Sequence, residues 1–116
     1  MLVNQVPDWA ELHHMANSMA SAAFEASAGQ DYYKIGTAAD IQYLASGGSD
    51  DWARGVAGIK WTFLIELPPH RKAFSPTQQI RGFLLPSKQI LPVANSVFQG
   101  FQQMISSIRQ LGYGKV

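Results

Sequence analysis

Hydrophobic residues recur with a helical period in two stretches of this chain and with the period of a β-strand in a third. Residues 8–28 and 92–111 carry apolar residues every three or four positions, which gives each stretch one apolar face. Residues 60–67 alternate, as a strand with one buried face does. The pattern therefore predicts a helix, a strand and a second long helix. The apolar stripes are Leu12, Met15, Ala16, Met19, Ala23 and Phe24 in the first helix and Val93, Val97, Phe98, Phe101, Met104, Ile105 and Ile108 in the second.

Turn and capping residues set the ends of the two long helices. Asp8, with Glu11 three residues later, forms a predicted capping box before the first helix, and Gly29 supplies its stop. Pro92 opens the last helix, where its missing N–H costs nothing. The stripe of the first helix is narrow and rich in small residues, so we expect that helix to pack closely on a sheet.

The residues between the long helices predict turns and two short helices. Residues 37–43 are interpreted as a loop and a short helix. Ser49 is a good N-cap for a second short helix, whose first turn carries Asp50 and Asp51. Carboxylates in that position are favoured by the helix dipole, so both aspartates have a structural explanation that needs no function.

Composition and charge exclude several classes of protein. The 116 residues are 47% hydrophobic and 15% charged, which is typical of one folded domain and not of a disordered chain. The net charge is +1 and no Lys/Arg cluster alternates with aromatic residues, so nucleic acid is not expected as a partner. No run of ~18 apolar residues occurs and the N-terminus has no export signal, so no membrane partner is expected either. The absence of cysteine excludes disulfides and thiolate metal sites.

One carboxylate stands out on the predicted strand. Glu66 lies on the face opposite the apolar row, in a segment that is otherwise strongly hydrophobic. A carboxylate there is costly unless it is paired, exposed in a cleft or used in function. For an isolated glutamate, pairing with a lysine or arginine is the better explanation.

Three blocks of sequence resemble the C-terminal part of the zinc metallocarboxypeptidases of the carboxypeptidase A/B type. The blocks are IQYLASGGSDDW, GIKWTFLIEL and GFLLPSKQILP, at residues 41–52, 58–67 and 82–92. They occur in the family's order, and weaker similarity extends back through residues 8–36, so the resemblance covers nearly the whole chain. It implies an α/β fold with a mixed central sheet flanked by helices. Residues 1–116 would then be the C-terminal portion of a single, incomplete catalytic domain.

The resemblance implies roles for five residues. Glu66 matches the catalytic glutamate, a base that takes a proton from a zinc-bound water and passes it to the leaving amine. Tyr43 matches a tyrosine on a mobile loop that closes over the bound peptide and donates a hydrogen bond to it. Asp50 matches the base of the pocket for the last side chain, where aspartate accompanies a preference for lysine or arginine. Ala38 borders that pocket and leaves room for a long side chain, whereas Leu64, where the family often has threonine, argues mildly against this preference.

The zinc ligands of the resembled enzymes are missing from this chain. Those enzymes hold zinc with a His-x-x-Glu pair and a later histidine, and by position this chain begins just after the last ligand. Neighbouring side chains on a helix point about 100° apart, so His13 and His14 do not easily share one ion. We expect both to be solvent-exposed, as we do His70 in its Pro/Lys/Arg-rich loop. No metal ligand is therefore predicted here, although the complete enzyme would require zinc.

The sequence after Leu67 departs from the family pattern. The resembled enzymes continue with an Arg-Asp pair and a short loop, whereas this chain inserts PPHRKAFSPTQQIR before Gly82. Arg71 or Lys72 could replace the lost arginine. The longer loop is a candidate rim of the substrate cleft.

Three functions remain open on this sequence. The first is a fragment of a zinc carboxypeptidase whose complete form, with the missing N-terminal part of the same domain, acts on peptide or protein C-termini, with a preference for Lys/Arg ends. The second is a shortened, catalytically inactive member that binds peptides or a partner protein, and the third is a plain structural domain. Family resemblance implies an extracellular or secretory-pathway location. A lone strand would leave unpaired edges, so we expect the isolated chain to fold poorly or to aggregate.

Overall fold

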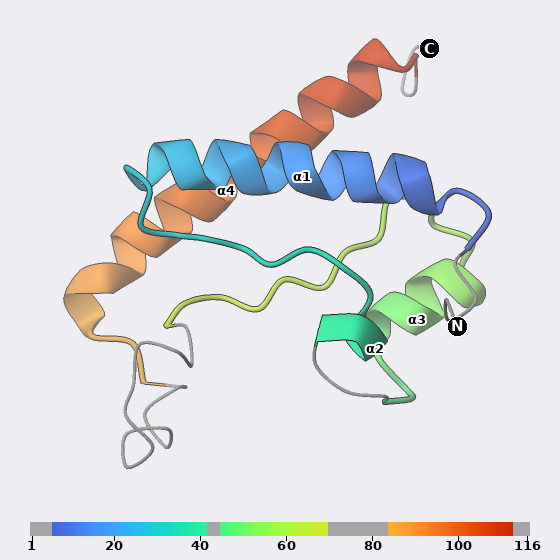
Figure 1. Cartoon of the computed structure of the whole chain (residues 1–116), viewed down its shortest axis with the longest axis horizontal. Helices are drawn as coiled ribbons and strands as arrows, with labels where there is room; N and C mark the ends of the chain where they lie inside the picture. Colours follow the sequence, from blue (N-terminus) through green and yellow to red (C-terminus); the bar gives the residue numbers. More distant parts are fainter. Residues whose placement is uncertain (1–5, 42–44, 70–83, 113–116) are drawn as a thin grey trace.

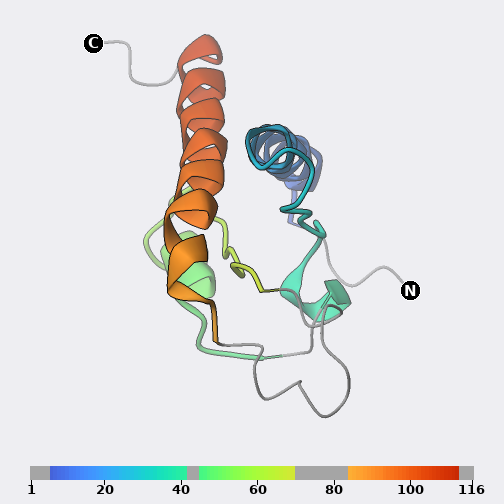
Figure 2. The ribbon, with the colours of Figure 1, turned by 90° about the vertical axis from the view of Figure 1, so that its left-hand side faces the viewer.

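A computed structural model describes residues 6–41, 45–69 and 84–112 of the chain. Its helices, in chain order, are α1 (Trp9–Ala26), α2 (Ala38–Ile41), α3 (Ser49–Gly55), the 3₁₀ turn η3 (Ser87–Gln89) and α4 (Ile90–Gln110). The long helices α1 and α4 run in opposite directions and cross obliquely, and α2, α3 and the irregular segments lie on one side of this pair (Figures 1 and 2). No helix among these residues is both long and apolar enough to cross a bilayer.

Small residues allow α1 and α4 to approach closely. The buried residues of this interface are Met15, Met19 and Ala23 of α1 and Val93, Ser96 and Gly100 of α4. A Cβ atom placed on Gly100 would lie 3.1 Å from the carbonyl oxygen of Met19. A larger residue at position 100 would therefore press against the backbone of α1, which would have to shift to admit it.

Replacing Gly100 with valine is expected to lower the free energy of unfolding by roughly 1–3 kcal/mol, the usual range for overpacking a well-packed interface. The obstacle is a backbone carbonyl, which cannot rotate away as a side chain can. Urea denaturation followed by circular dichroism measures the change. Gly55→Val is the matched control, because an added Cβ at Gly55 meets nothing within 4 Å. Equal effects of the two substitutions would contradict the close approach of α1 and α4.

A buried carboxylate links the end of α1 to α4. Asp31 is 9% exposed, and its side chain accepts a hydrogen bond from Ser96 Oγ. The amide of Asp31 donates to Ser27 Oγ at 2.8 Å, and that hydroxyl donates to the carbonyl oxygen of Phe24 at 2.9 Å. Because a buried charge is costly unless it is hydrogen-bonded, these contacts fix the path of the chain as it leaves α1.

Tyr33 couples this buried region to pH. Burial, with the negative charge of Asp31 as the smaller cause, raises the pKa of the Tyr33 phenol from 10.0 to about 12. The folded chain thus keeps a proton that the unfolded chain loses near pH 10. The stabilisation is fully present below that pH and is lost as the pH rises through about 12.

We therefore expect the urea midpoint to fall between pH 10 and pH 12, and Tyr33→Phe to remove the part of that fall that comes from Tyr33. Tyr32→Phe is the matched control, because Tyr32 is the adjacent tyrosine and is 68% exposed. An alkaline profile that Tyr33→Phe and Tyr32→Phe alter equally would contradict the assignment.

The predicted long helices are confirmed, with small shifts at their ends. Gly29 adopts a left-handed φ of 82° and donates its amide to the Phe24 carbonyl at 2.8 Å, so it terminates α1 as expected. α4 begins at Ile90, two residues before Pro92. Pro92 is still tolerated, because the first four N–H groups of a helix have no intrahelical partner.

The predicted caps are wrong in detail. Asp8 precedes α1 but forms no side-chain cap hydrogen bond, because its carboxylate binds Arg54 instead. Glu11 likewise accepts a hydrogen bond from Lys60 at 2.6 Å. The short acidic helix forms as α3, but Gly48 is its N-cap and Ser49 is its first residue.

The strand predicted over residues 60–67 does not form, and no strand occurs in residues 6–41, 45–69 or 84–112. A β-strand exists only when a neighbour pairs with its backbone, and none of these described segments provides one. For the same reason α1 packs on α4 and not on a sheet, which corrects the expectation for its narrow stripe. The described part of the chain is helical, and the mixed sheet stays a prediction.

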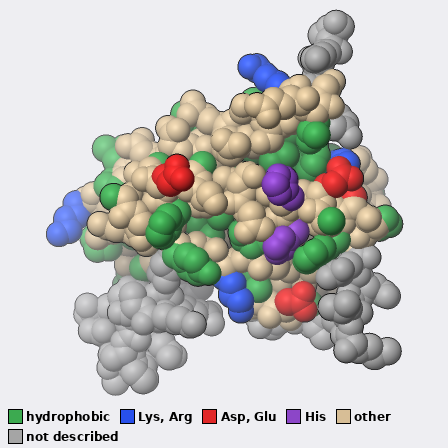
Figure 3. Space-filling model, turned by 45° about the horizontal axis from the view of Figure 1, so that its top comes forward, with side chains coloured by type: hydrophobic (Ala, Val, Ile, Leu, Met, Phe, Trp, Pro, Cys, Tyr) green, Lys and Arg blue, Asp and Glu red, His purple; other side chains and the backbone are tan. Residues whose placement is uncertain are grey.

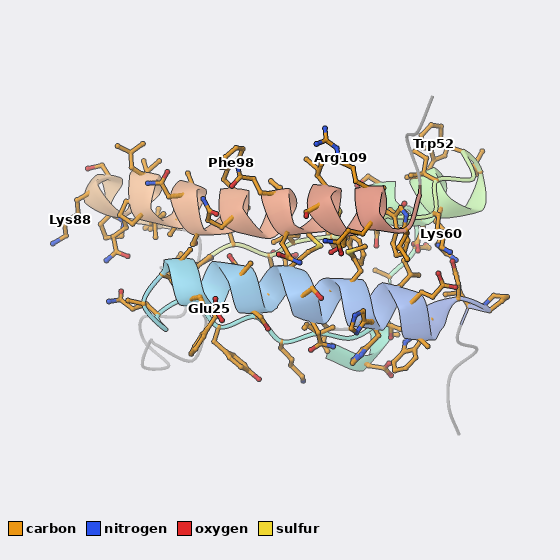
Figure 4. The ribbon with its side chains drawn as sticks, turned by 90° about the horizontal axis from the view of Figure 1, so that it is seen from above. Glu25, Trp52, Lys60, Lys88, Phe98 and Arg109 are labelled. Carbon is orange, nitrogen blue, oxygen red and sulfur yellow. The ribbon has the colours of Figure 1, made fainter. Side chains whose placement is uncertain are left out.

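The apolar stripe predicted for α4 is divided between two faces. Val93 is buried and Val97, Met104 and Ile108 are partly buried, but Phe98 is 55% exposed. Phe98 and Arg109 project from the side of α4 that faces away from α1 (Figure 4). The small residues Ser96 and Gly100 take the places nearest α1, so bulky side chains turn outward. The exposed members of the predicted stripe are Phe98, Phe101 and Ile105.

Candidate functional site

Asp50 is placed by the turn that begins α3. The N-cap Gly48 has φ −66° and ψ 148°, and the helix then starts at Ser49. Asp50 is partly buried and lies against this turn, since a Cβ atom added to Gly48 would be 2.5 Å from Asp50 Oδ1. Glycine at position 48 thus leaves room for the Asp50 carboxylate beside the helix N-terminus, where negative charge is favoured.

A hollow of about 640 Å³ lies beside Asp50. It is formed where α3 and the following turn face the start of α1. Within it, Asp8, Asp50 and Asp51 supply three carboxylates, and Arg54 and Lys60 supply two cations. The remaining lining is largely apolar or glycine: Val6, Pro7, Gly55, Gly58, Ile59 and Thr62.

Arg54 and Lys60 each form an ion pair with an acidic side chain at the start of α1. Arg54 donates from Nη2 to the Asp8 carboxylate and from Nη1 to the Lys60 carbonyl at 2.8 Å. Lys60 donates to Glu11 at 2.6 Å, and its Nζ lies 5.0 Å from the centre of the Trp61 ring. These contacts join residues 46 and 49 positions apart, which is why sequence patterns did not reveal them. In Figure 4, Lys60 lies between the first turn of α1 and α3.

Ala38, predicted to border the pocket, is the first residue of α2 and is exposed. Thr37 caps this short helix: its Oγ1 accepts the Asp40 amide at 3.2 Å and donates to Asp40 Oδ2 at 2.7 Å. The Thr-x-x-Asp spacing is a readable capping signal that the analysis of the sequence missed. Ala38 is not among the residues that line the hollow beside Asp50.

The other predicted site residues lie apart from this hollow. Leu64 and Glu66 are exposed and belong to the irregular segment after Lys60, and neither lines the hollow. Glu66 makes no side-chain hydrogen bond or ion pair to any residue within 6–41, 45–69 or 84–112. Tyr43 lies outside the described residues. Of the predicted site residues that the structure describes, only Asp50 lines the hollow, and Ala38, Leu64 and Glu66 are not gathered there with it.

His13 and His14 differ in solvent exposure, whereas the sequence predicts that both are exposed. His14 is exposed, but His13 is partly buried, stacks on Trp9 with ring centroids 4.6 Å apart, and lies 3.0 Å from Asn17 Nδ2. Both appear on the surface of α1 in Figure 3, and His70 lies outside the described residues. Within the described ranges, no three His, Cys, Asp or Glu side chains are grouped so that they could hold a metal ion.

Comparison with known proteins places these features in one family. The family described as zinc carboxypeptidase matches residues 3–100. Carboxypeptidase B of Astacus astacus is 32% identical over 102 residues, 88% of this chain and 30% of that protein. Carboxypeptidase A2 of Rattus norvegicus is 42% identical over 81 residues, 70% of this chain and 17% of that protein.

A further carboxypeptidase of the A type, from another animal, is also similar to this chain. Carboxypeptidase A1 of Bos taurus is 38% identical over 95 residues, 82% of this chain and 20% of that protein. A comparison with solved structures gave no match. The chain spans less than a third of the length of these three relatives. The family match covers most of the chain and includes Ala38, Tyr43, Asp50, Leu64 and Glu66, so this chain belongs to the zinc carboxypeptidase family.

Proposed function

We propose that residues 1–116 are the C-terminal portion of a peptidase catalytic domain whose complete form removes the last amino acid of peptides and proteins. The family match over residues 3–100 carries this proposal, together with relatives of greater length. In the complete domain, residues 60–67 would be one strand of a mixed sheet flanked by helices. The partners would be peptide or protein C-termini and the N-terminal part of the domain, with neither nucleic acid nor membrane, in the secretory pathway or outside the cell.

Zinc belongs to the family, but the residues that the structure describes do not fit a zinc site. The described residues contain no suitable group of ligands, and none of the three histidines in the sequence has a His-x-x-Glu spacing. The ion would be held by residues outside this chain, and its binding is not part of the chemistry proposed for these residues.

Glu66 is proposed as the residue that moves the proton. An exposed carboxylate without an ion-pair partner in the described structure is free to accept a proton from the attacking water and to return it to the leaving amine. Tyr43 would donate a hydrogen bond to the bound peptide. Leu64 and Ala38 do not line the hollow in the described structure and would border the pocket for the last side chain only in the complete domain.

Asp50 is proposed as the residue that selects lysine or arginine at the substrate's end. Its carboxylate is partly buried and lines a hollow, and it makes no ion pair with any described residue. A cationic side chain entering from this hollow would form the charge-assisted hydrogen bonds that a partly buried carboxylate favours.

A chimera tests the proposal by carrying this chain in place of the matched 102 residues of the A. astacus enzyme. With peptides that end in arginine or leucine, we expect turnover and an arginine preference that Asp50→Asn lowers about 10- to 100-fold. Glu25→Gln is the charge-matched control, since Glu25 is exposed on α1 and does not line the hollow.

The outcomes of this assay separate the candidate functions. A folded, zinc-loaded chimera that binds both peptides and cleaves neither would support the inactive, peptide-binding alternative. Cleavage with equal loss of preference in the Asp50 and Glu25 variants would overturn the assignment of Asp50.

A further inference from the structure

Arg54 lines the hollow beside Asp50, and its guanidinium could pair with the Asp50 carboxylate. Arg54 follows Asp50 by four residues and Asp51 by three on α3. Side chains at these spacings share one face of a helix, and an acidic residue four positions before a basic one is a favourable arrangement. On sequence alone, Arg54 would therefore be expected to pair with Asp50.

The structure directs Arg54 elsewhere. Its guanidinium binds the Asp8 carboxylate and the Lys60 carbonyl, and the Asp8 and Arg54 side chains are only 21% and 26% exposed. A partly buried ion pair with a second hydrogen bond holds its geometry better than an exposed pair on one helix. Asp50 is left without a cation from the described residues, although Arg54 lines the same hollow.

We propose that Asp8 is a positioning residue for substrate specificity: by holding Arg54 at the start of α1, it keeps the Asp50 carboxylate open to a cationic substrate side chain. This inference rests on the proposed role of Asp50. It adds that specificity depends on a residue 42 positions away, which acts through its ion pair with Arg54.

Loss of Asp8 should then turn Arg54 into an internal competitor. In Asp8→Ala, the guanidinium loses its carboxylate partner, and the nearest carboxylates on its own helix are those of Asp50 and Asp51. A guanidinium beside Asp50 would occupy the Asp50 carboxylate and repel a second cation. The apparent affinity of the site for an arginine side chain should therefore fall about 3- to 10-fold. Removing Arg54 as well should restore it.

The first part of the test follows Arg54 in the full 116-residue chain without any ligand. The side-chain Nε resonance of Arg54 is recorded by NMR before and after Asp50→Asn, once with Asp8 present and once in Asp8→Ala. We expect Asp50→Asn to leave the resonance in place when Asp8 is present and to shift it when Asp8 is absent. Equal responses in the two backgrounds would overturn the proposal. Asp8→Asn, which keeps the shape of the side chain, replaces Asp8→Ala if the latter does not fold.

The second part measures KM and kcat in the chimera with the peptides that end in arginine and leucine. Asp8→Ala should raise KM for the arginine peptide about 3- to 10-fold and leave its kcat unchanged. KM and kcat for the leucine peptide should not change. Asp8→Glu should keep the wild-type KM, and Asp8→Ala/Arg54→Ala should recover it. A merely structural ion pair predicts the opposite, because the double variant would be no better than the single one.

The two proposals fail in distinguishable ways. If Asp50→Asn removes the arginine preference but Asp8→Ala does not raise KM, or is not rescued by Arg54→Ala, the role of Asp8 is overturned and that of Asp50 stands. If Asp50→Asn leaves the arginine preference intact, the proposed role of Asp50 fails, and the specificity role of Asp8 fails with it.

Discussion

Replacing Glu66 with glutamine is expected to lower the turnover number of the chimeric enzyme by about 100- to 10,000-fold, the usual contribution of a positioned acid or base. Glutamine keeps the size and hydrogen-bonding shape of the side chain but cannot accept a proton at neutral pH. KM should change little, because the proposed role of Glu66 is proton transfer and not binding. Steady-state kinetics with the arginine peptide, at pH values on both sides of neutrality, measure both quantities.

The exposed position of Glu66 supplies a sharp control for this experiment. Glu25 is also an exposed glutamate, and it lies on α1 outside the hollow beside Asp50. Glu25→Gln removes the same charge without touching the proposed site, so its turnover should equal that of the unsubstituted chimera. If Glu66→Gln retains as much activity as Glu25→Gln, Glu66 is a surface carboxylate and the proposed mechanism is wrong.

The helices could be predicted from sequence because their signals are local. The stripe of Met15, Met19 and Ala23 and the stop at Gly29 lie within a few turns of each other, and the structure places them as expected. Local signals also gave the short acidic helix that presents Asp50. The same signals missed which face of α4 packs on α1, because hydrophobicity favours Phe98 whereas close helix contact favours Ser96 and Gly100.

The caps and the hollow could not be predicted because their determinants lie far apart in sequence. Asp8 has every local feature of an N-cap, yet Arg54, 46 residues later, offers it a charged partner. A charge-assisted hydrogen bond is roughly twice as strong as a neutral one, so the distant partner wins over the backbone amides of α1. Both partners of this contact line the hollow next to Asp50, and no spacing rule could have placed them there.

Residues 62–67 have the alternating pattern of a strand but pair with no strand in the described part of the chain. They include Leu64 at 55% and Leu67 at 54% exposed, and no described neighbour pairs with their backbone. Exposed leucines and unpaired backbone groups are the features of a strand whose sheet is absent. The relatives are more than three times as long as the part that this chain matches, so the proposed complete domain offers the missing neighbours.

Adding the rest of the domain is therefore expected to convert residues 61–67 into a protected strand. We expect their amide exchange to slow by about 1,000-fold, or roughly 4 kcal/mol in opening free energy, when this chain is co-expressed with the part of the A. astacus enzyme that it does not match. Hydrogen exchange measured by mass spectrometry compares the two samples, with the peptide from the middle of α1 as the internal control, since its hydrogen bonds already exist in the chain alone. Strong protection of residues 61–67 in the chain by itself would show that the segment finds a strand partner within these 116 residues, and would contradict its assignment as one strand of a larger sheet.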